Sequence, residues 1–212
     1  IAIAMALFGT SIGAAFGNIP ANRIGRKKSL IWIGILFLVS SIGAALAPEV
    51  ISFMVFRFIS GLSIGASSVV APVYISEIAP AKYRGRLVIS FQLNIVAGIL
   101  LAYLSNYLLQ GVGGENDWRW MLGVMVLPAA IFLLLLPTVP ETPRWLATAG
   151  RWDEAAAVSN RLCATPAESE FQMNEMELEK AGERTTQTQV YNDLRAELKH
   201  AEEVLAARGQ RA

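Results

Sequence analysis

Cysteine and histidine each occur only once in this 212-residue chain. The single cysteine, Cys163, excludes a disulfide within the chain, and the single histidine, His200, excludes a histidine-rich metal site. The sequence also lacks a nucleophile with a matching base, a metal-ligand cluster and a glycine-rich phosphate loop. These absences argue against an enzyme and predict no cofactor.

Charge is scarce in the first two thirds of the chain. Up to Thr138 there are nine basic and four acidic residues, and the other nine basic and thirteen acidic residues follow. Hydrophobic residues make up 54% of the chain, and the mean hydropathy is +0.44. This pattern predicts a part that lies in lipid, followed by a part that lies in water. The net charge of +1 gives no reason to expect nucleic-acid binding.

Five apolar stretches are each close to the roughly 20 residues that a membrane-spanning helix needs. They lie at 1–21, 30–47, 51–79, 87–109 and 119–138. The predicted fold is therefore all-α, a multi-pass transmembrane helical bundle over residues 1–139. We expect an intracellular domain of amphipathic helices over 140–184 and a polar helical tail over 185–212, whose charged faces are typical of a solvated helix or a partner-binding coil.

The loops between these stretches alternate in charge. Residues 23–28, residues 82–86 and the segment with Arg144 and Arg151 are basic, whereas the loops at Glu49 and at 115–117 are not. The positive-inside rule places basic loops in the cytoplasm, so the chain starts outside and its tail ends inside. Five spans with this orientation predict that one helix precedes the first. Trp145 is expected in the inner interfacial belt.

Four motifs occur in a fixed order along the chain. The loop NRIGRKK starts at Asn22, and the segment SFQLNIVAGILLAYLSNY starts at Ser90. PETPRWL covers 140–146. The fourth motif is a spaced set consisting of Arg57, Gly61, Gly65, Tyr74, Glu77 and Arg84. Together they resemble the sugar porter family of the major facilitator superfamily, from about residue 1 to 183. Asn22 stands where the family usually has Asp.

The resemblance implies roles for particular residues. Gln92, Ile95 and Ile99 would contact substrate, although helix packing is an alternative for each. Gly61 and Gly65 share one helical face and would allow close helix packing. The loop motif would comprise Asn22, Arg23, Gly25, Arg26 and Lys27, with plain topological and headgroup contacts as the alternative. Coupling or gating would involve Arg57, Glu77, Arg84, Glu141 and Arg144, with unlinked surface charges as the alternative.

The resulting hypothesis is half of a major-facilitator-type transporter. The full-length protein would carry a monosaccharide by alternating access, and this chain alone would be inactive because the site lies between two bundles. The expected partners are a small-molecule sugar, the lipid bilayer, a preceding first helix and a C-terminal half-bundle. The expected location is the plasma or bacterial inner membrane. Proton symport and facilitated diffusion both stay open, and the alternative is a non-transporting sugar sensor that signals through its cytoplasmic tail.

Overall fold

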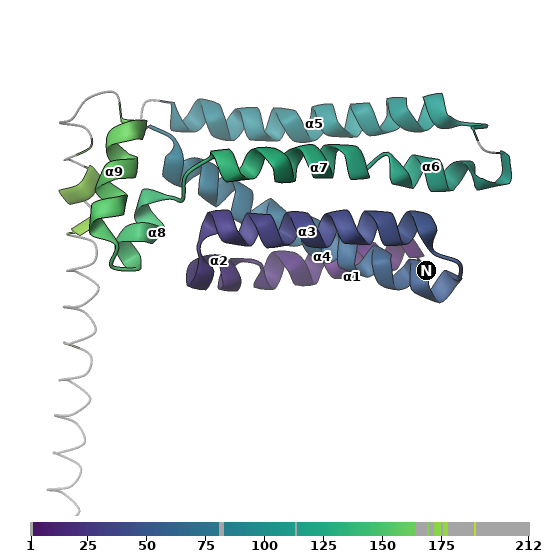
Figure 1. The fold of residues 1–212 in the computed structure, drawn as a ribbon, viewed down its shortest axis with the longest axis horizontal. Coiled ribbons are helices and arrows are strands. Elements are labelled where there is room, and N and C mark those ends of the chain that lie inside the picture. The colour runs from purple at the N-terminus through teal and green to yellow at the C-terminus, as the bar shows by residue number, and fades with distance from the viewer. Residues whose placement is uncertain are drawn as a thin grey trace, which may run out of the picture. The chain divides into compact units, whose positions relative to one another are not determined.

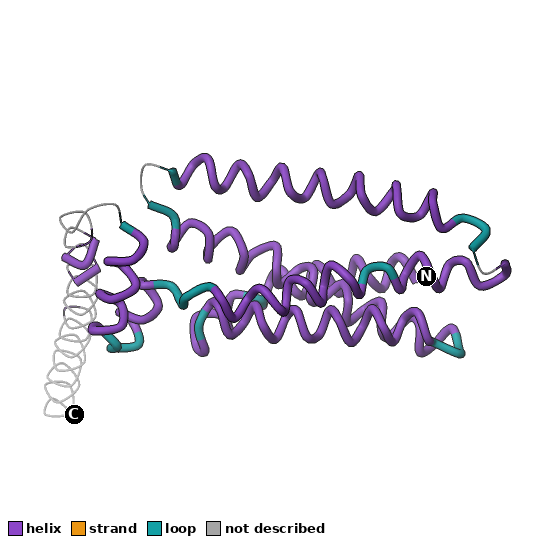
Figure 2. Tube along the Cα trace, turned by 45° about the horizontal axis from the view of Figure 1, so that its top comes forward, coloured by secondary structure: helices purple, strands orange, loops and turns teal. Residues whose placement is uncertain are grey.

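The computed structural model describes residues 2–80, 83–112, 114–163, 169, 172–174, 176–177 and 189. These residues form helices and no strand, which confirms the all-α prediction (Figures 1 and 2). The α-helices are α1 (Ala2–Phe16), α2 (Asn18–Ile24), α3 (Arg26–Leu46), α4 (Val50–Ile78), α5 (Arg84–Leu109), α6 (Asp117–Gly123), α7 (Val126–Leu135), α8 (Pro143–Thr148) and α9 (Trp152–Leu162). Two 3₁₀ turns, η1 (Gly114–Asn116) and η2 (Leu136–Thr138), complete them.

Within the described ranges, four helical segments are long and apolar enough to cross a membrane: Arg26–Leu46, Val50–Ile78, Arg84–Leu109 and Asp117–Thr138. The predicted first span, 1–21, is instead divided, because α1 ends at Phe16 and α2 begins at Asn18. Proline lacks an N–H, so Pro20 cannot donate to the Phe16 carbonyl four residues earlier. The helix therefore breaks at Gly17.

A second proline interrupts the predicted span at 119–138. The Val124 carbonyl has no donor at Pro128 and accepts instead from the Leu127 N–H at 3.1 Å. This hydrogen bond spans three residues, where an α-helical hydrogen bond spans four, and it marks the break between α6 and α7. The two helices nevertheless continue in one direction (Figure 1). The whole segment remains apolar and 22 residues long, so it still has the length of a span.

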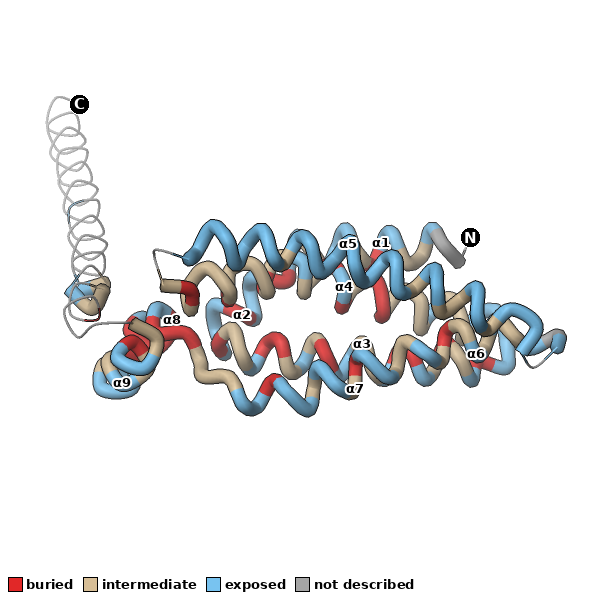
Figure 3. The backbone as a smooth tube through the Cα atoms, turned by 90° about the horizontal axis from the view of Figure 1, so that it is seen from above, coloured by how far each residue is buried: buried red, intermediate tan, exposed pale blue. Residues whose placement is uncertain are grey.

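Helix α4 lies at the centre of the bundle and packs against α1 and α3, and α3 also packs against α6 and α7. A small core at one end joins Ala21, Leu30, Val70, Tyr74 and Leu136. By contrast, α5 has no buried residue and is exposed along nearly its whole length (Figure 3). An apolar helix exposed in this way needs lipid or another helix around it.

The short helices α8 and α9 follow the bundle and belong to the same unit, Ile1–Ala164, while Thr165–Ala212 forms a separate unit. Helix α9 has Asp153 and Glu154 in its first turn and Arg161 in its last, which suits the helix dipole. The expected helices at 168–183 and in the tail lie mostly outside the described residues, so the boundaries at 139, 184 and 185 remain predictions.

Candidate functional site

The loop motif forms a tight junction between α2 and α3. Helix α2 ends at Gly25, whose φ of 105° is unfavourable for any residue with a side chain, and α3 begins at Arg26. A Cβ on Gly25 would also collide with the carboxylate of Glu141. Glycine at this position therefore allows both the chain reversal and the close approach of a residue that lies far along the sequence.

Arg26 and Glu77 form an ion pair across this junction. Arg26 Nη2 lies 3.1 Å from Glu77 Oε1, and the two side chains are only 13% and 8% exposed. Arg26 Nη1 also donates to the Ala21 carbonyl at 3.4 Å. Arg26 Nε and Glu77 Oε2 are buried without a hydrogen-bond partner among the described residues. The pair therefore retains unused hydrogen-bonding capacity, which a further group could satisfy.

Glu141 caps the start of α3 from 114 residues away in sequence. Its Oε1 accepts the backbone N–H of Lys27 at 2.9 Å and that of Thr142 at 3.2 Å. The first N–H groups of a helix lack partners within the helix, and a carboxylate there is favoured by the helix dipole. Lys27 Nζ donates to the Pro137 carbonyl at 2.9 Å. The PETPRWL segment is thus bound to the loop through the Glu141 carboxylate, and the residue Pro137 shortly before it is bound through its backbone carbonyl.

Two aromatic side chains hold the same segment in place. The Tyr74 hydroxyl donates to the Pro140 carbonyl at 2.7 Å, and Trp145 Nε1 donates to the Asn22 carbonyl at 3.0 Å. Trp145 is 8% exposed, so it is packed within protein and does not form the lipid-facing belt that its sequence position indicated. Thr142 begins α8 by accepting the Trp145 N–H at 3.4 Å. We call this assembly of Asn22–Lys27, Tyr74, Glu77 and Pro137–Trp145 the loop network.

The other proposed gating residues lie at the edge of the loop network or outside it. Arg84 is exposed as the first residue of α5, and Arg144 is exposed on α8. Glu77 pairs with Arg26, an arginine of the loop motif. Arg23 and Asn22 are exposed on α2, although the Asn22 carbonyl is used by Trp145.

Arg57 lies toward the opposite end of the bundle. Its guanidinium carbon stands 5.4 Å from the centre of the Phe53 ring, one turn earlier in α4, in a cation–π arrangement. Phe53 in turn meets Trp118 edge to face at 5.7 Å. The Arg57 guanidinium is therefore in contact with an aromatic ring. Among the described residues, no acidic side chain lies within ion-pair distance of it.

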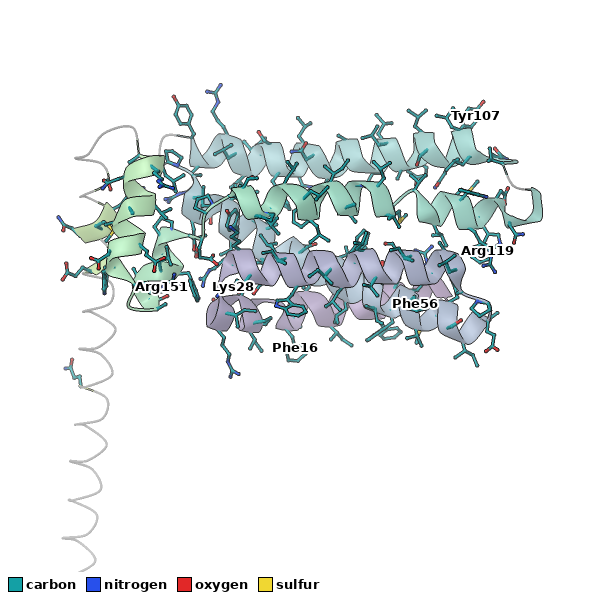
Figure 4. The ribbon with its side chains drawn as sticks, in the orientation of Figure 1. Phe16, Lys28, Phe56, Tyr107, Arg119 and Arg151 are labelled. Carbon is teal, nitrogen blue, oxygen red and sulfur yellow. The ribbon has the colours of Figure 1, made fainter. Side chains whose placement is uncertain are left out.

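Sequence reasoning did not single out Arg119. This residue of α6 donates to the carbonyls of Ala45 at 3.3 Å and Ala47 at 3.0 Å, at the end of α3 (Figure 4). A guanidinium at the C-terminal end of a helix satisfies free carbonyls and suits the helix dipole. The sequence shows an arginine between Trp118 and Trp120, but it does not reveal that backbone atoms 72 and 74 residues away are its acceptors.

The proposed substrate-contacting residues share α5. Gln92, Ile95 and Ile99 are spaced so that they fall on one helical face, and all three are exposed. The structure therefore leaves this face open to a ligand, to lipid or to another helix.

Small residues bring α1 and α4 into backbone contact. A Cβ on Gly61 would meet the Ala6 backbone, and one on Gly65 would meet the backbones of Thr10 and Ala14. From the other side, Gly9 and Gly13 face the backbone of α4 in the same way. The two helices can approach this closely only because glycine lacks a side chain.

Removing the Tyr74 hydroxyl tests the attachment of the PETPRWL segment to α4. We expect Tyr74→Phe to lower the free energy of unfolding by about 1 to 2 kcal/mol, because the Pro140 carbonyl loses a short hydrogen bond in a buried setting. The exposed Tyr107 provides the control, and Tyr107→Phe should change stability by less than about 0.5 kcal/mol. Unfolding in mixed micelles with increasing dodecyl sulfate would measure both, and equal effects would contradict this role.

The described residues contain no group of three or more His, Cys, Asp or Glu side chains that could hold a metal ion. The loop network links α2, α3, α4 and α8 through ion pairs and hydrogen bonds. It can therefore hold the ends of these helices together or release them. Such interactions can break and re-form as helices move, without any covalent step.

Comparison with known proteins gives a consistent result. The family model for sugar (and other) transporters matches residues 1–206. The galactose-proton symporter of Escherichia coli K12 is 41% identical over 170 residues, which cover 80% of this chain and 36% of that protein. The partially occluded inward-open xylose transporter XylE from E. coli superposes with a TM-score of 0.81 at 33% identity, covering 87% of this chain and 48% of the other. The proton:xylose symporter XylE bound to 6-bromo-6-deoxy-D-glucose gives 0.81 at 34% identity, covering 87% and 44%. The chain thus spans less than half of these relatives.

Proposed function

Because this chain belongs to the sugar porter family of the major facilitator superfamily, we propose that the whole protein moves a monosaccharide across a membrane by alternating access. The observation that carries the proposal is the match to sugar-proton symporters over most of the chain. Transport of this kind needs binding and conformational change but no covalent chemistry.

The loop network is proposed as the latch of this cycle. The Arg26–Glu77 pair and the Glu141 cap join helix ends by interactions that can open without breaking any covalent bond. Two of its buried polar atoms have no hydrogen-bond partner in the part of the chain that the structure describes, so a second arrangement with different partners is chemically available. Glu77 and Glu141 are the acceptors of this latch, while Arg84 and Arg144 stand close in sequence as donors for its other state.

Proton coupling is proposed to involve Arg57. An ionisable group in a membrane helix is costly unless it has a role or a partner, and Arg57 contacts an aromatic ring in the described structure. An acidic residue on a helix outside this sequence would provide the titrating partner. The location proposed is a plasma or bacterial inner membrane, with the loop network and the tail on the cytoplasmic side.

The sugar site is proposed to include Gln92, with Ile95 and Ile99 as the apolar surface beside it. An amide can donate to one sugar hydroxyl and accept from another, and the face that carries it is exposed. We expect Gln92→Ala in the intact protein to weaken sugar binding by about 1 to 3 kcal/mol, roughly 5- to 150-fold, because hydrogen bonds to the ligand are lost in a largely dry site.

Uptake of radiolabelled sugars by proteoliposomes, together with direct binding to the purified protein, would test both the site and the function. Asn94→Ala is the matched control, since Asn94 is an exposed amide two residues along α5 and points to a different face. Liposomes with this chain alone are the negative control, because one bundle does not complete a site between two. Sugar binding without uptake by the intact protein would contradict transport and favour a sensor.

A further inference from the structure

An apolar cavity of about 480 Å³ lies between α1, α2, α3 and α4, close to the loop network. Phe16 and Trp32 stand on its lining and are 60% and 61% exposed, so the cavity opens to the outside of the bundle (Figure 4 labels Phe16). Pro20 and Ile24 form its end nearest the basic loop, and Leu36 lies deeper along α3. The cavity is therefore a groove that runs from the basic loop into the apolar part of the bundle.

Two cations stand at the loop end of this groove. Arg23 lies one helical turn beyond the lining residue Pro20, and Lys28 lies one turn before the lining residue Trp32. Both are exposed, and neither has an ion pair among the described residues, whereas their neighbours Arg26 and Lys27 are engaged in the loop network. No acidic side chain lines the groove. The rim is thus positive, and the carboxylates nearest to it, Glu77 and Glu141, are engaged with Arg26 and with the backbone of Lys27.

Two buried serines lie on the wall of the groove, Ser63, which donates to the Ile59 carbonyl at 3.0 Å, and Ser29. Ser29 is 2% exposed, and its Oγ has no hydrogen-bond partner among the described residues. A buried hydroxyl without a partner is unfavourable, and an acceptor brought by a ligand would relieve that cost. Ser29 lies between Lys28 at the rim and Leu36 in the apolar part, so polar and apolar features follow in order along α3.

We propose that this groove binds one anionic phospholipid. Its phosphate lies between Arg23 and Lys28, an ester carbonyl accepts from Ser29, and an acyl chain extends past Trp32 and Leu36. The order of charge, hydroxyl and apolar surface along α3 matches the order of phosphate, ester and hydrocarbon in a glycerophospholipid. Basic residues at a membrane surface favour lipids of net negative charge. A zwitterionic lipid adds a cation beside Arg23 and Lys28, which is why the site prefers phosphatidylglycerol to phosphatidylcholine.

Native mass spectrometry of the purified chain tests the proposal with phosphatidylglycerol and phosphatidylcholine that have identical acyl chains. We expect the first phosphatidylglycerol to bind at least tenfold more tightly than the first phosphatidylcholine. Arg23→Gln with Lys28→Gln should abolish this preference. The control, Arg86→Gln with Arg161→Gln, removes the same charge from two exposed positions elsewhere and should retain it. Equal binding of both lipids, or equal losses in the two double variants, would overturn the proposal.

Filling the groove provides an independent test. Leu36→Trp should lower phosphatidylglycerol affinity at least fivefold, whereas Leu93→Trp on the exposed face of α5 should not. Ser29→Ala should lower it two- to threefold. An unchanged affinity in Leu36→Trp would place the lipid elsewhere. A dimer that disappears in Leu36→Trp would show that a second copy of the chain occupies the groove, which would also overturn the proposal.

Discussion

Replacing Glu77 by glutamine is expected to lower the free energy of unfolding by about 2 to 4 kcal/mol. The change leaves the Arg26 guanidinium, 13% exposed, without its counter-charge. Breaking a buried ion pair from one side costs about 3 to 5 kcal/mol, because an uncompensated charge remains, and the partial exposure of Arg26 reduces this figure. Reversible unfolding of the purified chain in mixed micelles would measure the loss.

The chain offers a matched control for this experiment. Arg151 and Glu154 also form an ion pair, with Nη2 and Oε2 2.6 Å apart, but their side chains are 45% and 56% exposed. Glu154→Gln should therefore cost less than about 1 kcal/mol, since water replaces the lost partner. Replacing Arg26 and Glu77 together by methionine should recover most of the stability lost in Glu77→Gln. Similar losses for Glu77→Gln and Glu154→Gln would mean that burial does not strengthen the Arg26–Glu77 pair.

The second large effect is expected at Gly65. Gly65→Val should destabilise the bundle by about 3 kcal/mol or more, because its side chain would enter the space of the α1 backbone at Thr10 and Ala14. Backbone atoms cannot move aside as a flexible side chain can, so α1 and α4 must separate. Gly65→Ala should show the same defect to a smaller degree. Unfolding curves of both variants, followed by tryptophan fluorescence, would give the graded loss.

Gly98 in the middle of α5 provides the comparison, because a Cβ there would meet no atom within 4 Å. Gly98→Val should leave the stability of this chain within about 0.5 kcal/mol of the original, since valine has a slightly higher helix propensity than glycine. A comparable loss at Gly98 would indicate that valine disturbs the helices themselves and not their contact. The α1–α4 interface would then need another explanation.

The length and hydrophobicity of the apolar stretches were sufficient to predict the helical architecture, and the four motifs indicated the family. Four of the five apolar stretches correspond to helical segments of spanning length, because an apolar run of that size leaves few alternatives for a hydrogen-bonded backbone in lipid. The division at Gly17 and the one at Val124 were not predicted. Gly17 lies three residues before Pro20 and Val124 lies four residues before Pro128, so the sequence contained the signal in the missing N–H of each proline.

The partners within the loop network were beyond sequence reasoning for a different reason. Glu77 was expected to belong to a charge network, and its position in the sequence does not reveal that it pairs with Arg26, 51 residues earlier. Glu141 binds backbone N–H groups, which every residue except proline possesses and which no sequence pattern distinguishes. The same holds for Arg119, whose acceptors are carbonyls. Motif residues can thus be recognised from sequence, while the atoms that they contact depend on how the helices pack.

The long-range cap on α3 has a consequence for biosynthesis. Lys27 leaves the ribosome well before Glu141, and at about 5 to 20 residues per second the intervening 114 residues take roughly 6 to 23 seconds. During this interval α3, α4, α5, α6 and α7 are synthesised while the start of α3 still lacks its cap. The end of the bundle that carries the loop network therefore matures last, after the apolar helical segments up to Thr138 have been synthesised.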